Sequence, residues 1–144
     1  MKSIGELLSG QHVHTLAQSS TVLDAARLMQ EAHIGAILVT GEREKLVGIF
    51  TERDLMSRVV VAGHDPGTLL LEEVMTRGLV TSTPERRVTE AAQEMQDRHI
   101  RHLPVVEDGQ VVGILSLRDL LRAHLEAKVQ EVDHLTAYIQ GDES

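Results

Sequence analysis

The pattern of hydrophobic and polar positions runs through the same order of elements twice. Each copy predicts an extended segment, an amphipathic helix, an apolar strand, a second strand after a turn, and a closing helix. In the first copy these are expected at residues 12–16, 22–33, 37–39 and 46–50, and from residue 51 onward. In the second copy they are expected at residues 79–83, 88–99, 103–106 and 111–115, and from residue 116 onward.

The two copies are also alike residue by residue. Segments 22–39 and 47–55 align with segments 88–105 and 112–120, and 14 of the 27 aligned positions are identical. A repeat of this length predicts two β-α-β-β-α units packed as a pseudo-symmetric pair in an α/β (α+β) fold. Two like units that pack face to face create two related clefts, each with the same polar residues.

The remaining segments connect and extend these units. Short helices are expected at residues 3–8 and 71–76, in equivalent places before each copy. We assign the first repeat with its N-terminal turn to residues 1–66, the second repeat with its linker to residues 67–125, and a helical extension and tail to residues 126–144. Pro104 lacks an N–H group, so it is expected at the start or edge of its strand.

The closing helix of the second copy is expected to continue to about residue 140. It carries an apolar stripe with steps near 3.5 residues, interrupted at Lys128. The members of the stripe are Leu121, Leu125, Val132, Leu135 and Ile139. The stripe packs either on its own domain or on a second copy of the chain, and the sequence favours neither alternative.

Composition narrows the classes of function. The net charge is −8 and the only aromatic residues are Phe50 and Tyr138, so the chain lacks the basic field and stacking rings of a nucleic-acid binder. The absence of cysteine excludes disulfides, cysteine-based zinc sites and thiol nucleophiles. No apolar run resembles a signal peptide or approaches the ~20 residues of a membrane helix. We therefore expect a soluble, cytoplasmic protein without a membrane partner.

One motif occurs in both copies, at residues 48–54 and 113–119. It consists of a glycine, two apolar residues, a hydroxyl residue, two variable residues and an aspartate. One interpretation is structural, because Thr51 and Ser116 are good helix N-caps and an acidic residue three positions later resembles a capping box. The glycine would then serve only to allow close backbone packing.

The other interpretation of the motif is a ligand site. A helix N-terminus with free N–H groups, a hydroxyl and a basic neighbour, Arg53 or Arg118, can hold an anion. An aspartate one turn into the helix, Asp54 or Asp119, could accept hydrogen bonds from a vicinal diol. A phosphate together with a diol indicates a ribonucleotide. The presence of the whole set in both copies favours this interpretation.

The chain resembles a tandem pair of cystathionine-β-synthase-type (CBS) domains, a Bateman module of the small stand-alone bacterial type. The resemblance covers roughly residues 12–125. It depends on segments 48–54, 113–119, 99–105 and 74–76. It implies two units related by a pseudo-twofold axis, sheets packed together, and a ligand cleft on either side. It also implies an adenosine ligand (AMP, ADP, ATP, NAD or S-adenosylmethionine), a homodimer, and control of a separate, unidentified protein.

The resemblance further implies roles for individual residues. Asp54 and Asp119 would accept the ribose hydroxyls. Phosphate or ribose contacts would come from Thr51, Ser116, Arg53 and Arg118. Contacts that clamp the adenine would come from His14, Val80, Ile34, Gly35, Ala36, Ile100, Arg101 and His102. The second copy has Arg101 and His102 where the first has Gly35 and Ala36, so we expect the clefts to differ in affinity or ligand.

Enzymatic and metal-binding functions find little support. No set of nucleophile, base and acid is visible in the sequence. The histidine pairs at positions 12 and 14 and at positions 99 and 102 lack cysteine or acidic partners at ligand spacing. We therefore predict a non-catalytic regulatory module that binds an adenine nucleotide. The alternative is an interaction scaffold that dimerises through helices and binds no nucleotide.

Overall fold

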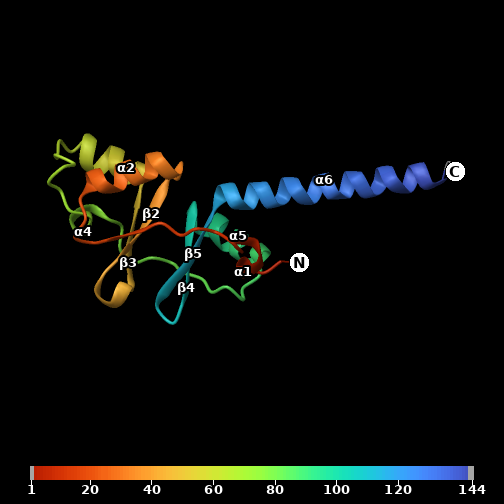
Figure 1. Ribbon diagram of the computed structural model, residues 1–144, viewed down its shortest axis with the longest axis horizontal. Coiled ribbons are helices and arrows are strands. Elements are labelled where there is room, and N and C mark those ends of the chain that lie inside the picture. Colours follow the sequence, from red (N-terminus) through yellow and green to blue (C-terminus); the bar gives the residue numbers. More distant parts are fainter. Residues whose placement is uncertain (1, 143–144) are drawn as a thin grey trace.

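The computed structural model describes residues 2–142, with side chains described as far as residue 133 (Figure 1). The first repeat and the segment before it contain α1 (Ile4–Leu7), β1 (Thr15–Ala17), α2 (Val22–Ala32), β2 (Ala36–Thr40), η1 (Glu42–Glu44), β3 (Leu46–Thr51), α3 (Glu52–Asp54) and η2 (Leu55–Val60). The linker and second repeat contain α4 (Leu71–Val74), α5 (Val88–Arg98), β4 (His102–Glu107), β5 (Gln110–Ser116) and α6 (Leu117–Asp142). The predicted mixed α/β fold with a long C-terminal helix is confirmed.

The two long helices of the repeats begin and end where the sequence pattern predicts. The Thr21 hydroxyl accepts a hydrogen bond from the Asp24 N–H at 3.1 Å, and the Asp24 carboxylate accepts one from the Thr21 N–H at 3.3 Å, which caps α2. Both helices end at a histidine in the left-handed region, His33 and His99, each with φ of 55°. The same chain reversal therefore leads into β2 and β4.

The sheets of the two repeats differ in one strand. In the first repeat β1, β2 and β3 form a three-stranded sheet, whereas β4 and β5 of the second form a two-stranded one. The predicted strand at residues 79–83 is wrong, since only Ser82 bridges to Val105 there. The Ser82 backbone N–H donates to the Pro104 carbonyl at 2.9 Å. The next hydrogen bond of a parallel ladder would run from the N–H of residue 104 to the Val80 carbonyl, and proline has no N–H. The ladder therefore stops after one residue.

The two short helices exchange places between the repeats. Helix α4 precedes the second repeat, yet Leu71 and Val74 are buried in the core of the first. Helix α1 precedes the first repeat, yet Ile4 is buried in the core of the second, and its N–H donates to the Arg86 carbonyl at 2.8 Å. Each repeat is thus completed by the segment that leads into the other, which the sequence did not indicate.

The faces of the two sheets meet in a third apolar cluster. Ala36, Leu38 and Ile49 of the first repeat are buried there. Residues that pack against them include Val111 and Ile114 of β5. Burial of these side chains supplies the hydrophobic contribution that holds the repeats together. The expected packing of sheet against sheet is confirmed.

Helix α6 begins directly after β5 and extends away from the body (Figure 1). Leu120 packs against the core of the second repeat, but the apolar residues of the stripe as far as Val132 lie on the surface; Leu121 and Leu125, for example, are 58% and 55% exposed. For the described side chains, the alternative in which the stripe packs on its own domain is therefore wrong. The side chains of Leu135 and Ile139 lie outside the described residues.

The glycine at the start of each motif allows close packing, and we expect the two to differ in their tolerance of alanine. A Cβ added at Gly48 would lie 2.5 Å from the Met75 Sδ atom and 3.0 Å from the Thr76 carbonyl oxygen. Because Met75 is buried, Gly48→Ala should lower the free energy of unfolding by about 1–3 kcal/mol, measured by urea denaturation. Gly113→Ala is the matched control. There a Cβ meets only side-chain atoms of Leu8 and Gln11, at 3.0 and 3.1 Å, so the loss should be smaller. An equal loss in the two variants would contradict this account.

Candidate functional site

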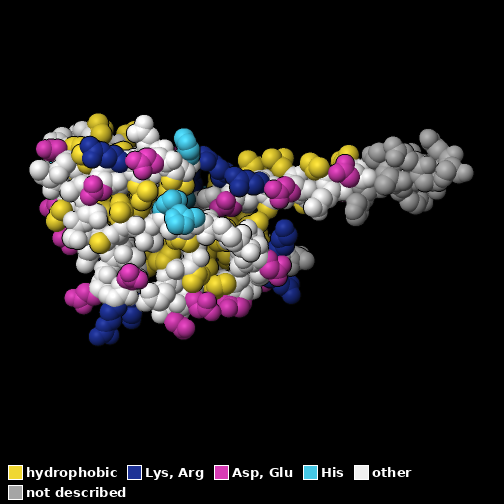
Figure 2. Space-filling view, in the orientation of Figure 1, with side chains coloured by type: hydrophobic (Ala, Val, Ile, Leu, Met, Phe, Trp, Pro, Cys, Tyr) yellow, Lys and Arg dark blue, Asp and Glu magenta, His cyan; other side chains and the backbone are white. Residues whose placement is uncertain are grey.

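A cleft of about 300 Å³ lies between the two repeats. Its walls come from the end of α2 and the start of β2 in the first repeat, and from β5 and the start of α6 in the second. The lining residues are Gln11, His12, His14, Ala32, His33, Ile34, Gly35, Ala36, Leu38, His102, Ile114, Ser116, Arg118, Asp119 and Arg122. Figure 2 shows histidine side chains gathered on this face, close to the base of α6. The volume falls at the lower end of the range for small-molecule sites.

Asp119 is held at the first turn of α6 by Ser116. The Ser116 N–H and hydroxyl donate to Oδ2 of Asp119 at 2.9 and 2.8 Å, and the Asp119 N–H donates to the Ser116 hydroxyl at 3.1 Å. All hydrogen bonds that the carboxylate accepts from described residues go to Oδ2. The capping interpretation is therefore correct for this motif, but it leaves Oδ1 free to bind a ligand at the edge of the cleft.

The cleft carries positive charge on an acidic protein. Arg118 and Arg122 line it one helical turn apart, Asp119 is the one carboxylate among the described lining residues, and the Glu52 carboxylate lies behind Gly35. Four histidines line it as well: His12, His14, His33 and His102. Burial lowers the pKa of His102, while Asp119 and Glu52 act in the opposite direction. The site can therefore attract an anion even though the whole chain has a net charge of −8.

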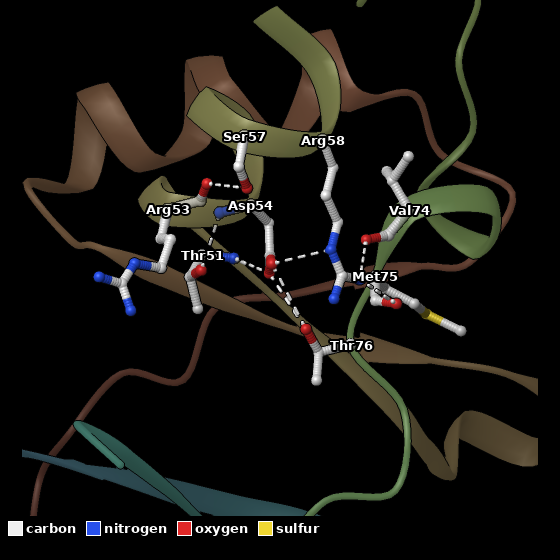
Figure 3. A network of polar contacts seen from close by, with 8 residues as sticks. All are labelled: Thr51, Arg53, Asp54, Ser57, Arg58, Val74, Met75 and Thr76. Atoms are coloured by element: carbon white, nitrogen blue, oxygen red, sulfur yellow. Dashed lines mark hydrogen bonds and ion pairs between the residues drawn. The ribbon is translucent and has the colours of Figure 1, made fainter. Parts of the chain in front are cut away.

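The equivalent aspartate of the first repeat, Asp54, is enclosed by other residues (Figure 3). Its Oδ2 accepts a hydrogen bond from the Thr51 N–H at 3.0 Å, and the Thr76 hydroxyl donates to the carboxylate at 3.4 Å. The Arg58 Nε atom lies 3.6 Å from its Oδ1. Asp54 is only 7% exposed. Both carboxylate oxygens thus have partners within the protein.

Arg58 also ties this aspartate to the linker. Its Nη1 donates to the Val74 carbonyl at 3.0 Å, so one guanidinium joins Asp54 to the end of α4. Figure 3 shows Arg53 pointing away from Asp54, and Arg53 is exposed. The aligned position in the second repeat is Ala123, which can form no such ion pair. The network around Asp54 is therefore a feature of the first repeat alone.

The cleft brings together part of the set that the sequence singled out. The residues that share its lining are His14, Ile34, Gly35, Ala36, His102, Ser116, Arg118 and Asp119. Those outside its lining are Thr51, Arg53, Asp54, Val80, Ile100 and Arg101. Gly35 and Ala36 of the first repeat line the same cleft as His102 of the second. The loop of each repeat therefore does not belong to a cleft of its own. The surroundings of Asp54 and Asp119 differ instead through Arg58 and Thr76.

Several lining residues did not stand out in the sequence. Arg122 could have been found, since it follows Arg118 by four residues and so lies on the same helix face. Gln11 gave no signal. Its side-chain amide donates to the Ile114 carbonyl and accepts from the Ile114 N–H, both at 3.1 Å. In the first repeat, the backbone of Thr76 exchanges the same pair of hydrogen bonds with Ile49 of β3. The Gln11 side chain therefore takes the place of a backbone partner beside β5.

A family model described as CBS domain matches the chain twice, over residues 4–61 and 71–126. The chain therefore belongs to the CBS domain family, as a tandem pair. The resemblance seen in the sequence is confirmed. The division of the chain at residues 66 and 125 stays a prediction.

Relatives and solved structures are similar over most of the chain. The mitochondrial CBS domain-containing protein CBSX3 of Arabidopsis thaliana is 37% identical over 98% of this chain and 70% of its own length. The CBS domain-containing protein YhcV of Bacillus subtilis is 37% identical over 83% of this chain and 84% of its own length. The CBS domain pair of protein MJ0100, solved in complex with 5′-methylthioadenosine and S-adenosyl-L-methionine, has a TM-score of 0.78 and 27% identity over 88% of this chain and 98% of its own.

Two further observations concern the described residues. Among them, no three histidine, cysteine or acidic side chains are arranged to hold a metal ion. Within the same part of the chain, no helix is both long and apolar enough to cross a membrane.

Burial of His102 predicts a pH dependence of stability in the nucleotide-free protein. Because its pKa is lowered from 6.5 in the folded state, the unfolded chain takes up this proton first. The free energy of unfolding should therefore fall as the pH drops below about 6.5, until the folded-state pKa is passed. His102→Gln should remove this part of the fall in urea titrations at several pH values. His124→Gln, at an exposed position of α6, is the control and should keep the wild-type profile. Identical profiles for wild type and His102→Gln would contradict the assignment.

Proposed function

We propose that this CBS pair is a non-catalytic regulatory module that binds an adenosine-containing ligand in the cleft around Asp119 and controls a separate partner protein. The observation that carries the proposal is the Asp119 carboxylate. Its Oδ2 is held by Ser116, its Oδ1 has no hydrogen bond from the described residues, and it lines a cleft with two arginines. A fixed carboxylate with a free oxygen can accept both hydroxyls of a ribose.

The rest of the cleft fits the other parts of a nucleotide. Ile34, Ala36, Leu38 and Ile114 offer an aliphatic surface for a base. Such a surface suits adenine in a chain with almost no aromatic residues, because the base can be held by aliphatic contact and main-chain hydrogen bonds. Arg118 lies in the first turn of α6, where the helix dipole also favours a phosphate.

The charge of the cleft indicates which adenosine ligands suit it best. The ligands in the MJ0100 structure support the adenosine class in general. Arg118 and Arg122 favour the members that carry phosphate, namely AMP, ADP, ATP and NAD, over the cationic sulfonium of S-adenosylmethionine. Among these, a second or third phosphate would make use of the second arginine.

We expect one principal cleft rather than two equal ones. A ribose at Asp54 would have to displace the Thr76 hydroxyl and the Arg58 guanidinium from a nearly buried carboxylate. Loss of these contacts from a nearly buried carboxylate costs free energy, whereas a ligand at Asp119 has no such contacts to displace from Oδ1. The sequence predicts unequal clefts from the loops, but both loops contribute to the cleft around Asp119, so the inequality proposed here depends on Arg58 and Thr76 instead.

Regulation would follow from the position of the cleft between the repeats. A ligand that contacts both β2 of the first repeat and α6 of the second stabilises one relative arrangement of the two. Such a ligand shifts the equilibrium only by the difference in its affinity for the two states. A partner protein that recognises one arrangement would sense the ligand. We also propose that the protein is located in the cytoplasm.

The central prediction is an unequal effect of removing the two aspartate charges. Asp119→Asn should weaken binding of AMP, ATP or NAD by about 1–3 kcal/mol, roughly 5- to 150-fold, because the hydrogen bonds to a charged acceptor are lost. Asp54→Asn is the matched control and should leave the affinity within about twofold. Isothermal titration calorimetry on nucleotide-free protein measures both.

Two results would count against the proposal. Equal losses in the two variants would remove the special place of Asp119. Wild-type protein that binds none of AMP, ADP, ATP, NAD and S-adenosylmethionine below millimolar concentration would overturn nucleotide binding, and would favour the scaffold that dimerises through helices.

A further inference from the structure

Helix α6 presents an unpartnered apolar stripe along the part whose side chains are described. Its members are Leu117, Leu121, Leu125, Val129 and Val132, which are 54–59% exposed. Steps of four, four, four and three residues keep them on one face of the helix. Figure 2 shows hydrophobic side chains along one edge of the projecting helix. Five large aliphatic residues in a row on a projecting helix mark an interaction surface rather than scattered exposure.

The charges beside the stripe run in a defined order. On the flank that follows the stripe, Arg118 and Arg122 come first, and Glu126 and Asp133 come later. A parallel neighbour of the same sequence would face this flank with the opposite one, which carries His124, Lys128 and Glu131. An antiparallel neighbour would bring arginine beside acid at both ends. In the antiparallel orientation this flank is therefore complementary to itself.

We infer that α6 pairs with α6 of a second copy in antiparallel orientation, with the apolar stripes in contact. A twofold axis perpendicular to the helices places the same flank of both copies on the same side. With the axis near residue 124, Arg122 of one copy lies beside Glu126 of the other, and Arg118 lies near Asp133. Both pairs occur twice, as a symmetric dimer requires.

The same arginines connect this surface to the cleft. Arg118 and Arg122 line both the cleft around Asp119 and the shallow groove along α6, whose apolar residues are Leu121, Leu125 and Val129. A guanidinium that binds a ligand phosphate is withdrawn from the acid of the second copy. Provided that the proposed nucleotide binding holds, the ligand should therefore weaken the pairing of α6, and pairing should weaken ligand binding by the same factor.

The first test is the oligomeric state of the full, nucleotide-free chain by sedimentation equilibrium. Wild type should be a dimer, and Leu125→Glu should be a monomer because it places a charge in the centre of the stripe. Val61→Glu is the matched control, since Val61 is 78% exposed but lies far from α6 in the sequence, and it should remain dimeric. A monomeric wild type, or a dimer that survives Leu125→Glu, would overturn the inference.

The second test is the orientation of the two helices. Arg122→Glu should raise the dimer dissociation constant about tenfold, because glutamate then lies beside glutamate twice. Adding Glu126→Arg to the same chain should restore the wild-type constant, since the pairs are re-formed with reversed charge. A parallel dimer would place these positions on opposite sides, so failure of the double variant to recover would overturn the antiparallel arrangement.

The third test is coupling, with ATP as the probe. Saturating ATP should raise the dimer dissociation constant of wild type, and an unchanged constant would overturn the coupling. Calorimetry with ATP separates this inference from the proposed function. A monomeric chain that binds ATP overturns the pairing and leaves the proposed function standing, whereas a dimer of α6 helices that binds no ATP overturns the ligand and leaves the pairing standing.

Discussion

Burial of one sheet against the other is the constraint on which the rest of this structure depends. Each repeat covers one face of its strands with its own helix, which leaves a second apolar face that neither repeat can bury alone. Leu38 and Ile49 of the first repeat and Ile114 of the second remove those faces from water together. The same contact brings the starts of β2 and α6 to the two walls of one cleft. The cleft is thus a consequence of how the core is completed.

The capping residues of the motif have a structural role in both repeats, and the surroundings determine whether a ligand can use them as well. Thr51 and Ser116 cap their helices with nearly the same hydrogen bonds to Asp54 and Asp119. Asp54 then receives Thr76 and Arg58 from its surroundings, while the free oxygen of Asp119 lies at a cleft. Two copies of one motif therefore diverge through residues outside the motif, and only a folded chain shows which residues those are.

Helix α6 links the two properties argued for this protein. Its first turn belongs to the cleft, and its exposed stripe extends the same helix into solvent. Because Arg118 and Arg122 line both the cleft and the groove along the stripe, a phosphate bound by them would also offset positive charge beside the stripe. The hypotheses of a nucleotide sensor and a helix-mediated dimer, which the sequence set against each other, are therefore compatible within one molecule.

The sequence by itself determined the repeat, the order of elements, the bounds of α2 and α5 and the family, because periodicity, caps and a long motif are local signals. It also singled out by their spacing Ser116, Arg118 and Asp119, which line the cleft. It did not reveal that residues 79–83 form no strand. The missing Pro104 N–H prevents a ladder only because the fold places Pro104 beside this segment. Nor did the sequence reveal the exchange of α1 and α4, the role of Gln11, or the Arg58 contact to Asp54. These depend on contacts between residues far apart in the chain, which only the tertiary structure brings together.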